Sequence, residues 1–331
     1  MSRPLRAGLV GLGVMGRNHA RVLQSLPDVE LVAAADPRPE ARAASNGIDA
    51  VATVRELIDR GIDLCVAATP TITHQDVAFE LAEAGVATLI EKPLAPDPKT
   101  AQTIVEAFAR HGVLGCVGHI ERFNPALQDL RRRLALGEIG ELYQVVTRRQ
   151  GPFPARIVDA GVVVDLATHD IDLTAWITGS PYRSVSACTA HRSGRPHEDL
   201  VSAVAELENG IVVTHLVNWL SPFKERITTV TGDLGCLVAD TITADLTFFQ
   251  NGSEPAQWER MAAFRGVTEG NMTRYAIPKP EPLLTELSHF AAAVRGEPST
   301  IVTLEEGLAT VEIAEALRES AASGETVKVS R

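Results

Sequence analysis

Continuous apolar runs and helical apolar patterns alternate through the first third of this chain. The runs at residues 5–10, 29–35, 63–68, 87–90 and 114–118 have the length and composition of buried parallel strands. Between them, the stretches 15–26, 74–84 and 97–111 place most of their apolar residues on one helical face. This alternation predicts an α/β domain with a doubly wound parallel sheet.

The second half contains successive strands. Residues 182–190, 200–207 and 211–219 are rich in Val, Ile and Thr, and Asn209-Gly210 is a strong hairpin signal between the last two. Further strands are expected at 141–149, 226–231, 236–239 and 246–249. Residues 252–282 are rich in Gly, Pro and polar side chains and predict a long connection that could approach the active site. Helical patterns return at 282–294 and 304–320, where Thr303 and Glu306 match a capping box. A separate α+β domain is therefore predicted.

Composition and charge are those of a soluble globular protein. The 331 residues are 45% hydrophobic and 22% charged, a length that favours two domains. The formal net charge of −11 argues against nucleic acid as a partner but leaves room for a local basic pocket. No apolar run approaches the ~20 residues that span a bilayer, and no signal peptide precedes the first strand. Cys65, Cys116, Cys188 and Cys236 form no C-x-x-C pair, so we expect reduced thiols in a cytoplasmic protein.

The first strand ends in GLGVMG, where Gly11, Gly13 and Gly16 have the G-x-G-x-x-G spacing. A helix and a second strand follow, and that strand ends in Asp36. This order predicts a dinucleotide site, because glycines let the backbone approach the pyrophosphate and the N-terminus of the helix attracts it. The residues of the turn expected to contact the cofactor are Gly11, Leu12, Gly13, Val14, Met15 and Gly16.

Asp36 also bears on which nicotinamide cofactor binds. Its carboxylate can accept hydrogen bonds from ribose hydroxyls and repels a 2′-phosphate, which favours NAD. Arg38 lies two residues further on and could neutralise such a phosphate. We therefore predict NAD and leave NADP open as an alternative.

Polar stretches follow three of the predicted parallel strands. They are Ala68-Thr69-Pro70, Glu91-Lys92-Pro93 and Gly118-His119. Ligands of open parallel sheets bind beyond the carboxyl ends of the strands, so these stretches are expected at the ligand. An isolated E-K-P sequence usually lies on the surface, but its place at a strand end of a dinucleotide fold favours a functional Lys92. Pro93 disfavours helical backbone at this lysine.

The sequence DLATHDIDL, residues 165–173, carries a second set of chemical candidates. If residues 164–177 are helical, Asp165, His169 and Asp172 lie on one face. His169 could then exchange a proton with a substrate hydroxyl while a carboxylate fixes its tautomer. Two alternatives are a partly exposed helix start without chemistry and a metal site. No H-E-x-x-H motif and no cysteine ligand supports a metal, and none is predicted.

Together, GLGVMG, ATPTITH (residues 68–74), EKP and DLATHDID resemble the Gfo/Idh/MocA family of oxidoreductases over nearly the full chain. The resemblance implies a Rossmann domain over residues 1–120 that binds NAD(P). It implies a substrate-binding and oligomerisation domain over residues 121–331, with a large, open, mainly antiparallel sheet. The C-terminal helices could pack back on the Rossmann domain. Thr71 stands where the family often has asparagine, and Ala167 replaces a common glycine.

By this resemblance, Lys92, Asp165 and His169 match the family's catalytic positions. The implied roles are His169 as acid/base for the reacting hydroxyl, Lys92 as the group that stabilises charge on the same oxygen, and Asp165 as the residue that orients one of them. Further cofactor contacts are implied at Thr69, Pro70, His74, Glu91 and Lys92.

The stretch GHIERFNP, residues 118–125, resembles the subgroup that acts on nucleotide sugars, most closely UDP-N-acetylglucosamine 3-dehydrogenases. A UDP-sugar carries a pyrophosphate, which Arg122, Arg148, Arg149 and Arg156 could bind. Strand alternation sends only one of Arg148 and Arg149 inward, and we choose Arg149. The expected substrate contacts are His119, Arg122, Asn124, Arg149, Asp165 and His169.

Three functions remain under consideration. The first is an NAD-dependent dehydrogenase that oxidises C3 of a UDP-activated amino sugar. The second is another family oxidoreductase, acting on inositol, a free sugar or a dTDP-ketosugar. The third is a non-catalytic nicotinamide-sensing regulator, which has no need of Lys92 and His169. The resemblance implies a homodimer or homotetramer.

Overall fold

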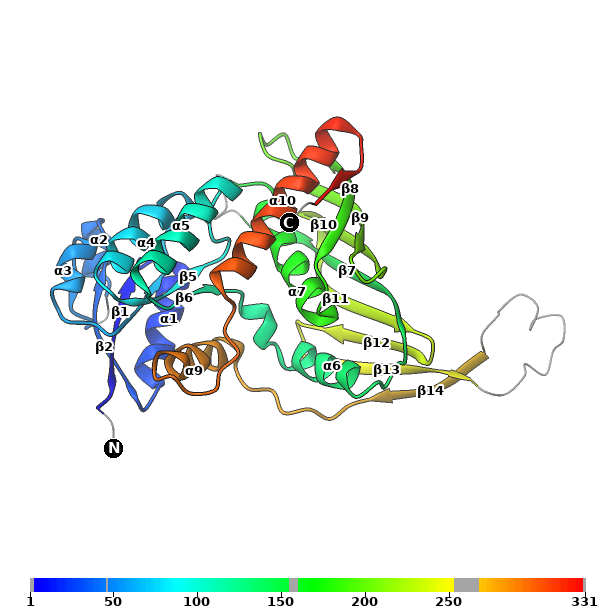
Figure 1. The fold of residues 1–331 in the computed structure, drawn as a ribbon, viewed down its shortest axis with the longest axis horizontal. Coiled ribbons are helices and arrows are strands. Elements are labelled where there is room, and N and C mark those ends of the chain that lie inside the picture. Colours follow the sequence, from blue (N-terminus) through cyan, green and yellow to red (C-terminus); the bar gives the residue numbers. More distant parts are fainter. Residues whose placement is uncertain (1–2, 46, 155–159, 253–267, 330–331) are drawn as a thin grey trace. The chain divides into compact units, whose positions relative to one another are not determined.

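The computed structural model describes residues 3–45, 47–154, 160–252 and 268–329 (Figure 1). The chain divides into two compact units. The first comprises Met1–Ile120 and Glu281–Glu312, and the second comprises Glu121–Pro280 and Ile313–Arg331. Within the described ranges, no helix is long and apolar enough to cross a membrane.

The first unit is built on a parallel sheet, which has six strands among the described residues, in the order β3-β2-β1-β4-β5-β6. The strands are β1 (Leu5–Val10), β2 (Val29–Ala35), β3 (Ala50–Val51), β4 (Leu64–Ala67), β5 (Ala87–Glu91) and β6 (Gly115–Gly118). The order reverses between β1 and β4, which is where doubly wound sheets bind their ligands. The predicted Rossmann topology is confirmed.

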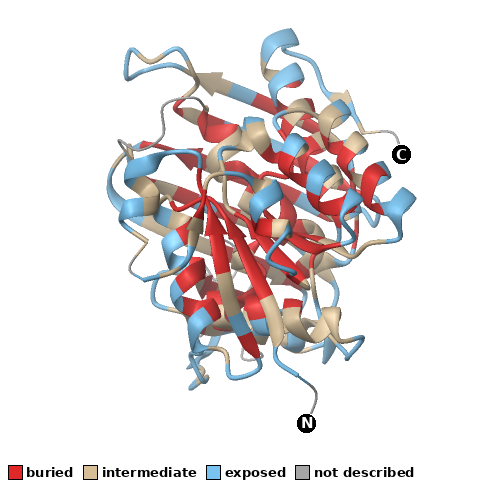
Figure 2. Cartoon of the chain, turned by 90° about the vertical axis from the view of Figure 1, so that its left-hand side faces the viewer, coloured by how far each residue is buried: buried red, intermediate tan, exposed pale blue. Residues whose placement is uncertain are grey.

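Helices cover both faces of this sheet. They are α1 (Val14–Ser25), α2 (Pro39–Ala43), α3 (Val54–Ile58), α4 (His74–Glu83), α5 (Pro98–His111), α9 (Pro282–Val294) and the first part of α10 (Leu304–Ser323). One apolar cluster packs α4 and α5 on the sheet, and another packs α1 and α9 on it. Figure 2 shows the result as buried strands between helices with exposed outer faces. The capping box predicted at α10 is present, since Thr303 and Glu306 exchange hydrogen bonds.

The second unit contains a large sheet, nine-stranded within the described residues, in the order β14-β13-β12-β11-β7-β10-β9-β8-β15. The strands are β7 (Leu142–Pro152), β8 (Tyr182–Ala190), β9 (Leu200–Leu207), β10 (Val212–Asn218), β11 (Leu220–Gly232), β12 (Gly235–Asp240), β13 (Asp245–Gly252), β14 (Thr268–Arg274) and β15 (Val327–Lys328). The pairing of β7 with β10 is parallel and the others are antiparallel. The predicted α+β domain with a mainly antiparallel sheet is confirmed.

One face of this sheet packs against helices. These are α6 (Pro125–Ala135), α7 (Thr168–Thr178) and the end of α10, and Figure 1 shows them lying along the sheet. Inward residues of the strands, such as Val145, Val213 and Val230, are fully buried in this core. The outward residues alternate with them and are half-buried or exposed.

Two details differ from the sequence prediction. The stretch 252–282 is not only a connection, because Thr268–Arg274 forms β14 and pairs with β13. The helix expected at 164–177 begins as a π-helix over Val163–Ala167 and becomes α-helical only at Thr168. The wider π turn changes which side chains share a face with Asp165, so the i, i+4, i+7 argument does not apply to the start of this helix.

Candidate active site

The glycine turn after β1 is closely packed at its first and last glycines. Gly11 has φ +96°, in the left-handed region, and a Cβ there would lie 2.4 Å from the carbonyl oxygen of Ala68. A Cβ at Gly16 would lie 1.8 Å from the carbonyl oxygen of Gly11. The turn therefore folds back on the first residue after β4 and on itself, and both contacts require glycine.

The middle glycine of the turn faces open space. A Cβ at Gly13 would meet no heavy atom within 4 Å, and no side chain of the described residues caps α1, whose N-cap is Gly13. No side chain of the described residues therefore caps the N–H groups at the positive end of the α1 dipole, and the space beside Gly13 is open. The residues present fit the pyrophosphate of a dinucleotide.

Asp36 lies at the end of β2 and faces this turn. Its Oδ2 accepts a 2.9 Å hydrogen bond from the backbone N–H of Leu12, and both carboxylate oxygens accept from Arg38 at 3.0 and 2.8 Å. Burial raises the pKa of Asp36, but these hydrogen bonds outweigh burial and lower the pKa to about 2. Asp36 is therefore ionised at neutral pH, as a carboxylate that binds ribose hydroxyls must be.

Lys92 directly follows β5. Glu91 and His74 both contact the loop that carries it. Glu91 Oε2 accepts a 3.1 Å hydrogen bond from the backbone N–H of Lys92, and Glu91 Oε1 lies 2.7 Å from Nε2 of the buried His19. The Lys92–Pro93 peptide bond is cis. His74 was expected to contact the cofactor. It is buried, with Nδ1 at 3.1 Å from the carbonyl oxygen of Pro93 and Nε2 at 3.1 Å from that of Thr69.

In the second unit, Asp165 lies in the π-helix and His169 in the first turn of α7, and both are half-buried. The start of the π-helix is held by Glu198, whose carboxylate accepts a hydrogen bond of 3.1 Å from the backbone N–H of Val163. The backbone N–H of Asp165 donates to the carbonyl of Gly161 at 3.0 Å. The segment that carries both predicted catalytic residues is thus fixed at its beginning by an acidic side chain.

The other carboxylates of this segment form buried ion pairs. Asp172 accepts two hydrogen bonds from Arg122, at 2.9 and 2.6 Å, and both residues are buried. Asp170 and Glu121 both accept from Arg149, each at 2.9 Å. Burial raises the pKa of Asp170, and the attraction of Arg149 offsets this only in part. Asp172, expected on the same helix face as His169, therefore forms an ion pair with Arg122 within the second unit.

The structure shows where the residues expected to bind substrate lie. Arg149 faces inward and Arg148 outward, toward Glu225, as strand alternation predicts. Asn124 caps α6 by accepting from the N–H of Ala126 at 3.0 Å and donates to the carbonyl of Thr241 at 3.0 Å. His119, directly after β6, is 1% exposed. Arg156 lies outside the described residues.

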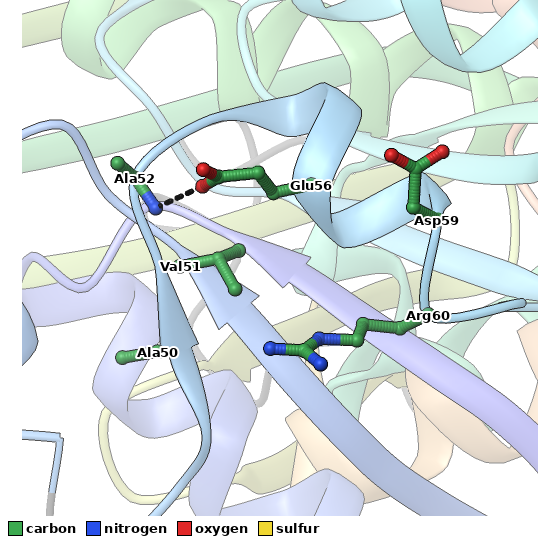
Figure 3. A pocket seen from close by; sticks show the side chains of 6 residues that line it. All are labelled: Ala50, Val51, Ala52, Glu56, Asp59 and Arg60. Atoms are coloured by element: carbon green, nitrogen blue, oxygen red, sulfur yellow. Dashed lines mark hydrogen bonds between the residues drawn. The ribbon is translucent and has the colours of Figure 1, made fainter.

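A metal centre would need several of the described side chains arranged around one ion. Over the described ranges, no group of three or more His, Cys, Asp or Glu side chains is arranged to hold a metal ion. A pocket of about 510 Å³ lies on β3 and α3 (Figure 3). Its lining residues are Ala50, Val51, Ala52, Glu56, Asp59 and Arg60.

Sequence reasoning assigned no role to two of these residues, His19 and Glu198. His19 lies in the helical stripe after the glycine turn and was counted with the apolar residues that cover the sheet. A fully buried histidine on such a stripe needs a polar partner, and that requirement was the available signal. Glu198 lies in a loop without any pattern, and nothing in the sequence connects it with Val163.

The comparisons with known proteins extend over both units. A family model described as an oxidoreductase family with an NAD-binding Rossmann fold matches residues 5–119. A second, described as the C-terminal alpha/beta domain of an oxidoreductase family, matches residues 131–329. The names of these two models are GFO_IDH_MocA and GFO_IDH_MocA_C.

Individual relatives differ in the substrates that their names state. Scyllo-inositol 2-dehydrogenase (NAD(+)) of Bacillus subtilis is 28% identical over 99% of this chain and 97% of its own. UDP-N-acetylglucosamine 3-dehydrogenase of Acidithiobacillus ferrooxidans is 34% identical over 63% of this chain and 65% of its own. The WlbA dehydrogenase from Bordetella pertussis, solved in complex with NADH and UDP-GlcNAcA, is 25% identical with a TM-score of 0.82, covering 99% of this chain and 100% of that one.

Proposed function

Because this chain belongs to the Gfo/Idh/MocA family of oxidoreductases, we propose that it oxidises the C3 hydroxyl of a nucleotide-activated amino sugar, such as UDP-N-acetylglucosamine, to a ketone. Family membership, the NAD-binding Rossmann domain and an oxidoreductase activity on CH–OH groups are established by the comparisons. The substrate and the individual roles of the residues are the proposal.

In this proposal each unit binds a different molecule. Residues 1–120 bind NAD through the glycine turn, Asp36 and the strand-end residues Thr69 and Pro70. Residues 121–331 bind the sugar and form the oligomer, with His119, Arg122, Asn124 and Arg149 as the predicted sugar contacts. The observation that carries the cofactor half is the open space at Gly13, the N-cap of α1, together with an ionised Asp36 that accepts from the neighbouring Leu12.

The chemical step requires that a hydroxyl lose a proton while its carbon loses a hydride. NAD supplies the hydride acceptor when bound. His169 takes the hydroxyl proton as general base, and Asp165 orients it. The ammonium of Lys92 donates a hydrogen bond to the same oxygen and stabilises the negative charge that develops there. Glu91 accepts a hydrogen bond from the backbone of Lys92, and Glu198 accepts one from Val163, at the start of the segment that carries His169.

The substrate proposal is supported by the relatives that bind or oxidise UDP-sugars and by the GHIERFNP stretch. The ion pairs of the second unit limit how the pyrophosphate is bound. Arg122 and Arg149 form ion pairs with Asp172, Asp170 and Glu121. They can therefore donate hydrogen bonds to a pyrophosphate but offer it little net positive charge.

A specific observation favours a second candidate, which is oxidation of an inositol. The inositol dehydrogenase of Bacillus subtilis matches this chain over 99% of its length. Neutralised arginines suit an uncharged polyol better than a pyrophosphate, because a polyol needs donors and acceptors and no compensating charge. The same Lys92 and His169 would serve this reaction.

One experiment separates the candidates. Purified protein is incubated with NAD and, in parallel, UDP-N-acetylglucosamine, myo-inositol, scyllo-inositol or glucose, and NADH formation is followed at 340 nm. NADP replaces NAD in a second series. Turnover of the UDP-sugar at a kcat/KM at least about 10-fold above the cyclitols supports the leading proposal, since discrimination by a few hydrogen bonds is of that order. Turnover of a cyclitol alone overturns it. No turnover despite NAD binding would favour a nicotinamide-sensing regulator.

The outward face of the large sheet supports the proposed homodimer or homotetramer. A row of Val and Thr residues crosses adjacent strands at matched register positions and faces away from the helices. The row is Val204, Thr214, Val146, Thr229, Val238 and Thr247. Val204 is 51% exposed and Phe249, beyond the row, is 42% exposed. A partly exposed face of this kind, rich in β-branched residues, fits a second copy of the same sheet.

A further inference from the structure

One carboxylate joins the dinucleotide-binding helix to the loop of Lys92. Glu91 Oε1 lies 2.7 Å from Nε2 of His19, in α1, and Glu91 Oε2 accepts the backbone N–H of Lys92 at 3.1 Å. His19 is fully buried, so water does not compete for its bond to Glu91. The two oxygens of Glu91 therefore hold two separate segments of the first unit.

The surroundings of His19 indicate which of its nitrogens carries the proton. Nε2 faces an ionised carboxylate, which only accepts hydrogen bonds, so Nε2 is the donor. Nδ1 is buried and has no hydrogen-bond partner among the described residues, so a proton there would be unsatisfied. Burial raises the pKa of Glu91, but the bond to His19 and the charge of Lys92 hold it below its ordinary value. The contact is thus an N–H donor on a charged acceptor.

The other side of the same loop is fixed by His74. Its Nδ1 lies 3.1 and 3.2 Å from the carbonyl oxygens of Pro93 and Leu94, and its Nε2 lies 3.1 Å from that of Thr69. With its proton on Nδ1, His74 anchors the loop after Lys92, as Glu91 anchors it before. Anchors of this kind hold a reactive side chain in a narrow range of positions.

We propose that His19 and Glu91 are positioning residues that couple occupation of the glycine turn to the placement of Lys92. This inference rests on the catalytic role proposed for Lys92. The N-terminus of α1 forms the end of the glycine turn, and His19 lies six residues beyond Gly13 on the same short helix. A displacement of α1 on dinucleotide binding would reach the backbone of Lys92 through the two hydrogen bonds of Glu91.

The test compares two substitutions of His19. His19→Leu removes the donor, whereas His19→Gln places an amide N–H where Nε2–H lies. Val22→Ala, at another fully buried position of α1, is the control for a general loosening of this helix. Hydrogen–deuterium exchange is followed in peptides covering residues 11–25 and 88–95, with and without NAD. Calorimetry measures NAD binding to each protein.

In the wild-type protein we expect NAD to slow exchange in both peptides by about 10-fold, the effect of a ligand present well above its Kd. His19→Leu should keep this effect at residues 11–25 and lose it at 88–95. His19→Gln and Val22→Ala should keep the slower exchange in both peptides. Equal slowing at 88–95 in His19→Leu overturns the proposal. Loss of NAD binding by a folded His19→Leu also overturns it, since His19 would then act on the turn itself.

A second substitution covers the case in which His19→Leu does not fold. Glu91→Gln leaves one acceptor oxygen for two donors, His19 Nε2–H and the backbone N–H of Lys92, so the side chain cannot hold both and the connection between α1 and Lys92 is broken at one end. The exchange response at residues 88–95 should be lost in this protein as well. Its persistence in Glu91→Gln contradicts the coupling.

Kinetics give an additional readout. On any alcohol that the wild type oxidises, His19→Leu should lower kcat by about 10-fold or more, the cost of a displaced catalytic group, while the KM for NAD stays within about 3-fold. Val22→Ala should not lower kcat in this way while leaving the KM for NAD unchanged. A wild-type protein that oxidises no alcohol contradicts the proposed function, and the exchange experiment then decides the coupling by itself.

Discussion

The carboxylate of Asp36, at the end of β2, accepts a 2.9 Å hydrogen bond from the backbone N–H of Leu12, in the turn that follows β1. The same carboxylate forms a two-point ion pair with Arg38. The acidic residue that sequence reasoning assigned to the ribose therefore also shapes the glycine turn and restrains the nearest cation. A substitution can remove the negative charge of Asp36 and still leave an oxygen that accepts hydrogen bonds.

Asp36→Asn should shift the preference of the protein toward NADP. The amide oxygen can still accept from Leu12, so the turn is kept, but the charge that repels a 2′-phosphate is lost and Arg38 is released to bind it. We expect the ratio of the Kd for NADP to that for NAD to fall by about 10-fold or more, typical of one charge-assisted contact. Calorimetry with both cofactors measures this ratio. Adding Arg38→Ala should abolish the gain, and an unchanged ratio in Asp36→Asn would contradict the assignment of Asp36.

Two alanine substitutions in the glycine turn should have opposite consequences. Gly13 has φ −70°, which any residue adopts, and its new methyl group would meet no protein atom within 4 Å. Gly13→Ala should therefore leave the Tm unchanged and weaken NAD binding at least about 10-fold, because the methyl group fills the space at the N-terminus of α1.

In Gly16→Ala the methyl group would lie 1.8 Å from the carbonyl oxygen of Gly11. We expect the free energy of unfolding to fall by about 1–3 kcal/mol, the usual cost of forced overpacking. Thermal unfolding and calorimetry on both proteins check the contrast. A stable Gly13→Ala protein that binds NAD normally would exclude the pyrophosphate from this position.

Most strands could be predicted because their burial is visible in the sequence. Parallel strands covered on both faces are continuous apolar runs, and 29–35 is both the predicted and the observed extent of β2. The strand β14, with the sequence TEGNMTR, escaped prediction for the same reason. Among the described residues it pairs with β13 alone, at the edge of the sheet, where a strand needs no apolar face.

The candidate site could be predicted only as far as local signals reach. The glycine turn, Asp36 and Lys92 are each marked by their position at a strand end. The partners that fix the site are far apart in sequence, such as His19 with Glu91 and Arg122 with Asp172, and no spacing rule connects such residues. Spacing also missed the π-helix, since its wider turn depends on contacts at Val163 that only the folded unit supplies.

Lys92→Met and His169→Ala should each lower kcat by about 10²-fold or more, the scale of acid–base and electrostatic contributions, while NAD binding persists. Lys99→Met, which removes an exposed lysine from the first turn of α5, is the matched control and should retain full activity. Initial rates of NADH formation and calorimetric titration with NAD measure the two effects separately. A His169→Ala protein with undiminished turnover would remove this residue from the reaction.

Charges on the outward face of the large sheet should dissociate the proposed oligomer. Val146 and Val204 belong to the Val and Thr row on this face and flank Thr214 in the register of the strands. The double substitution Val146→Arg and Val204→Arg places like charges opposite one another across a two-fold interface. We expect light scattering to report a monomer. Leu136→Arg, at the end of α6 and 71% exposed in the wild type, is the control and should not change the mass. A monomeric wild-type protein would contradict the proposed assembly.

His215 should make the second unit less stable in mild acid. The side chain is buried between two hydroxyls, with Nδ1 at 2.7 Å from Thr147 Oγ1 and Nε2 at 2.9 Å from Tyr182 Oη. Burial lowers the pKa of His215 from 6.5 to about 4. The unfolded chain therefore binds the proton more readily than the folded one, so the stabilisation is complete above pH 6.5 and is lost as the pH falls toward 4.

The slope contributed by this residue approaches about 1.4 kcal/mol per pH unit within that window, because a single proton is taken up on unfolding. His215→Gln retains a donor and an acceptor for the two hydroxyls but does not titrate. Urea unfolding at pH 7, 6 and 5 should show a steeper loss of unfolding free energy in the wild type than in His215→Gln. The carboxylates titrate equally in both proteins, so the difference between the two slopes isolates the imidazole. Identical slopes would mean that His215 accepts its proton in the folded state.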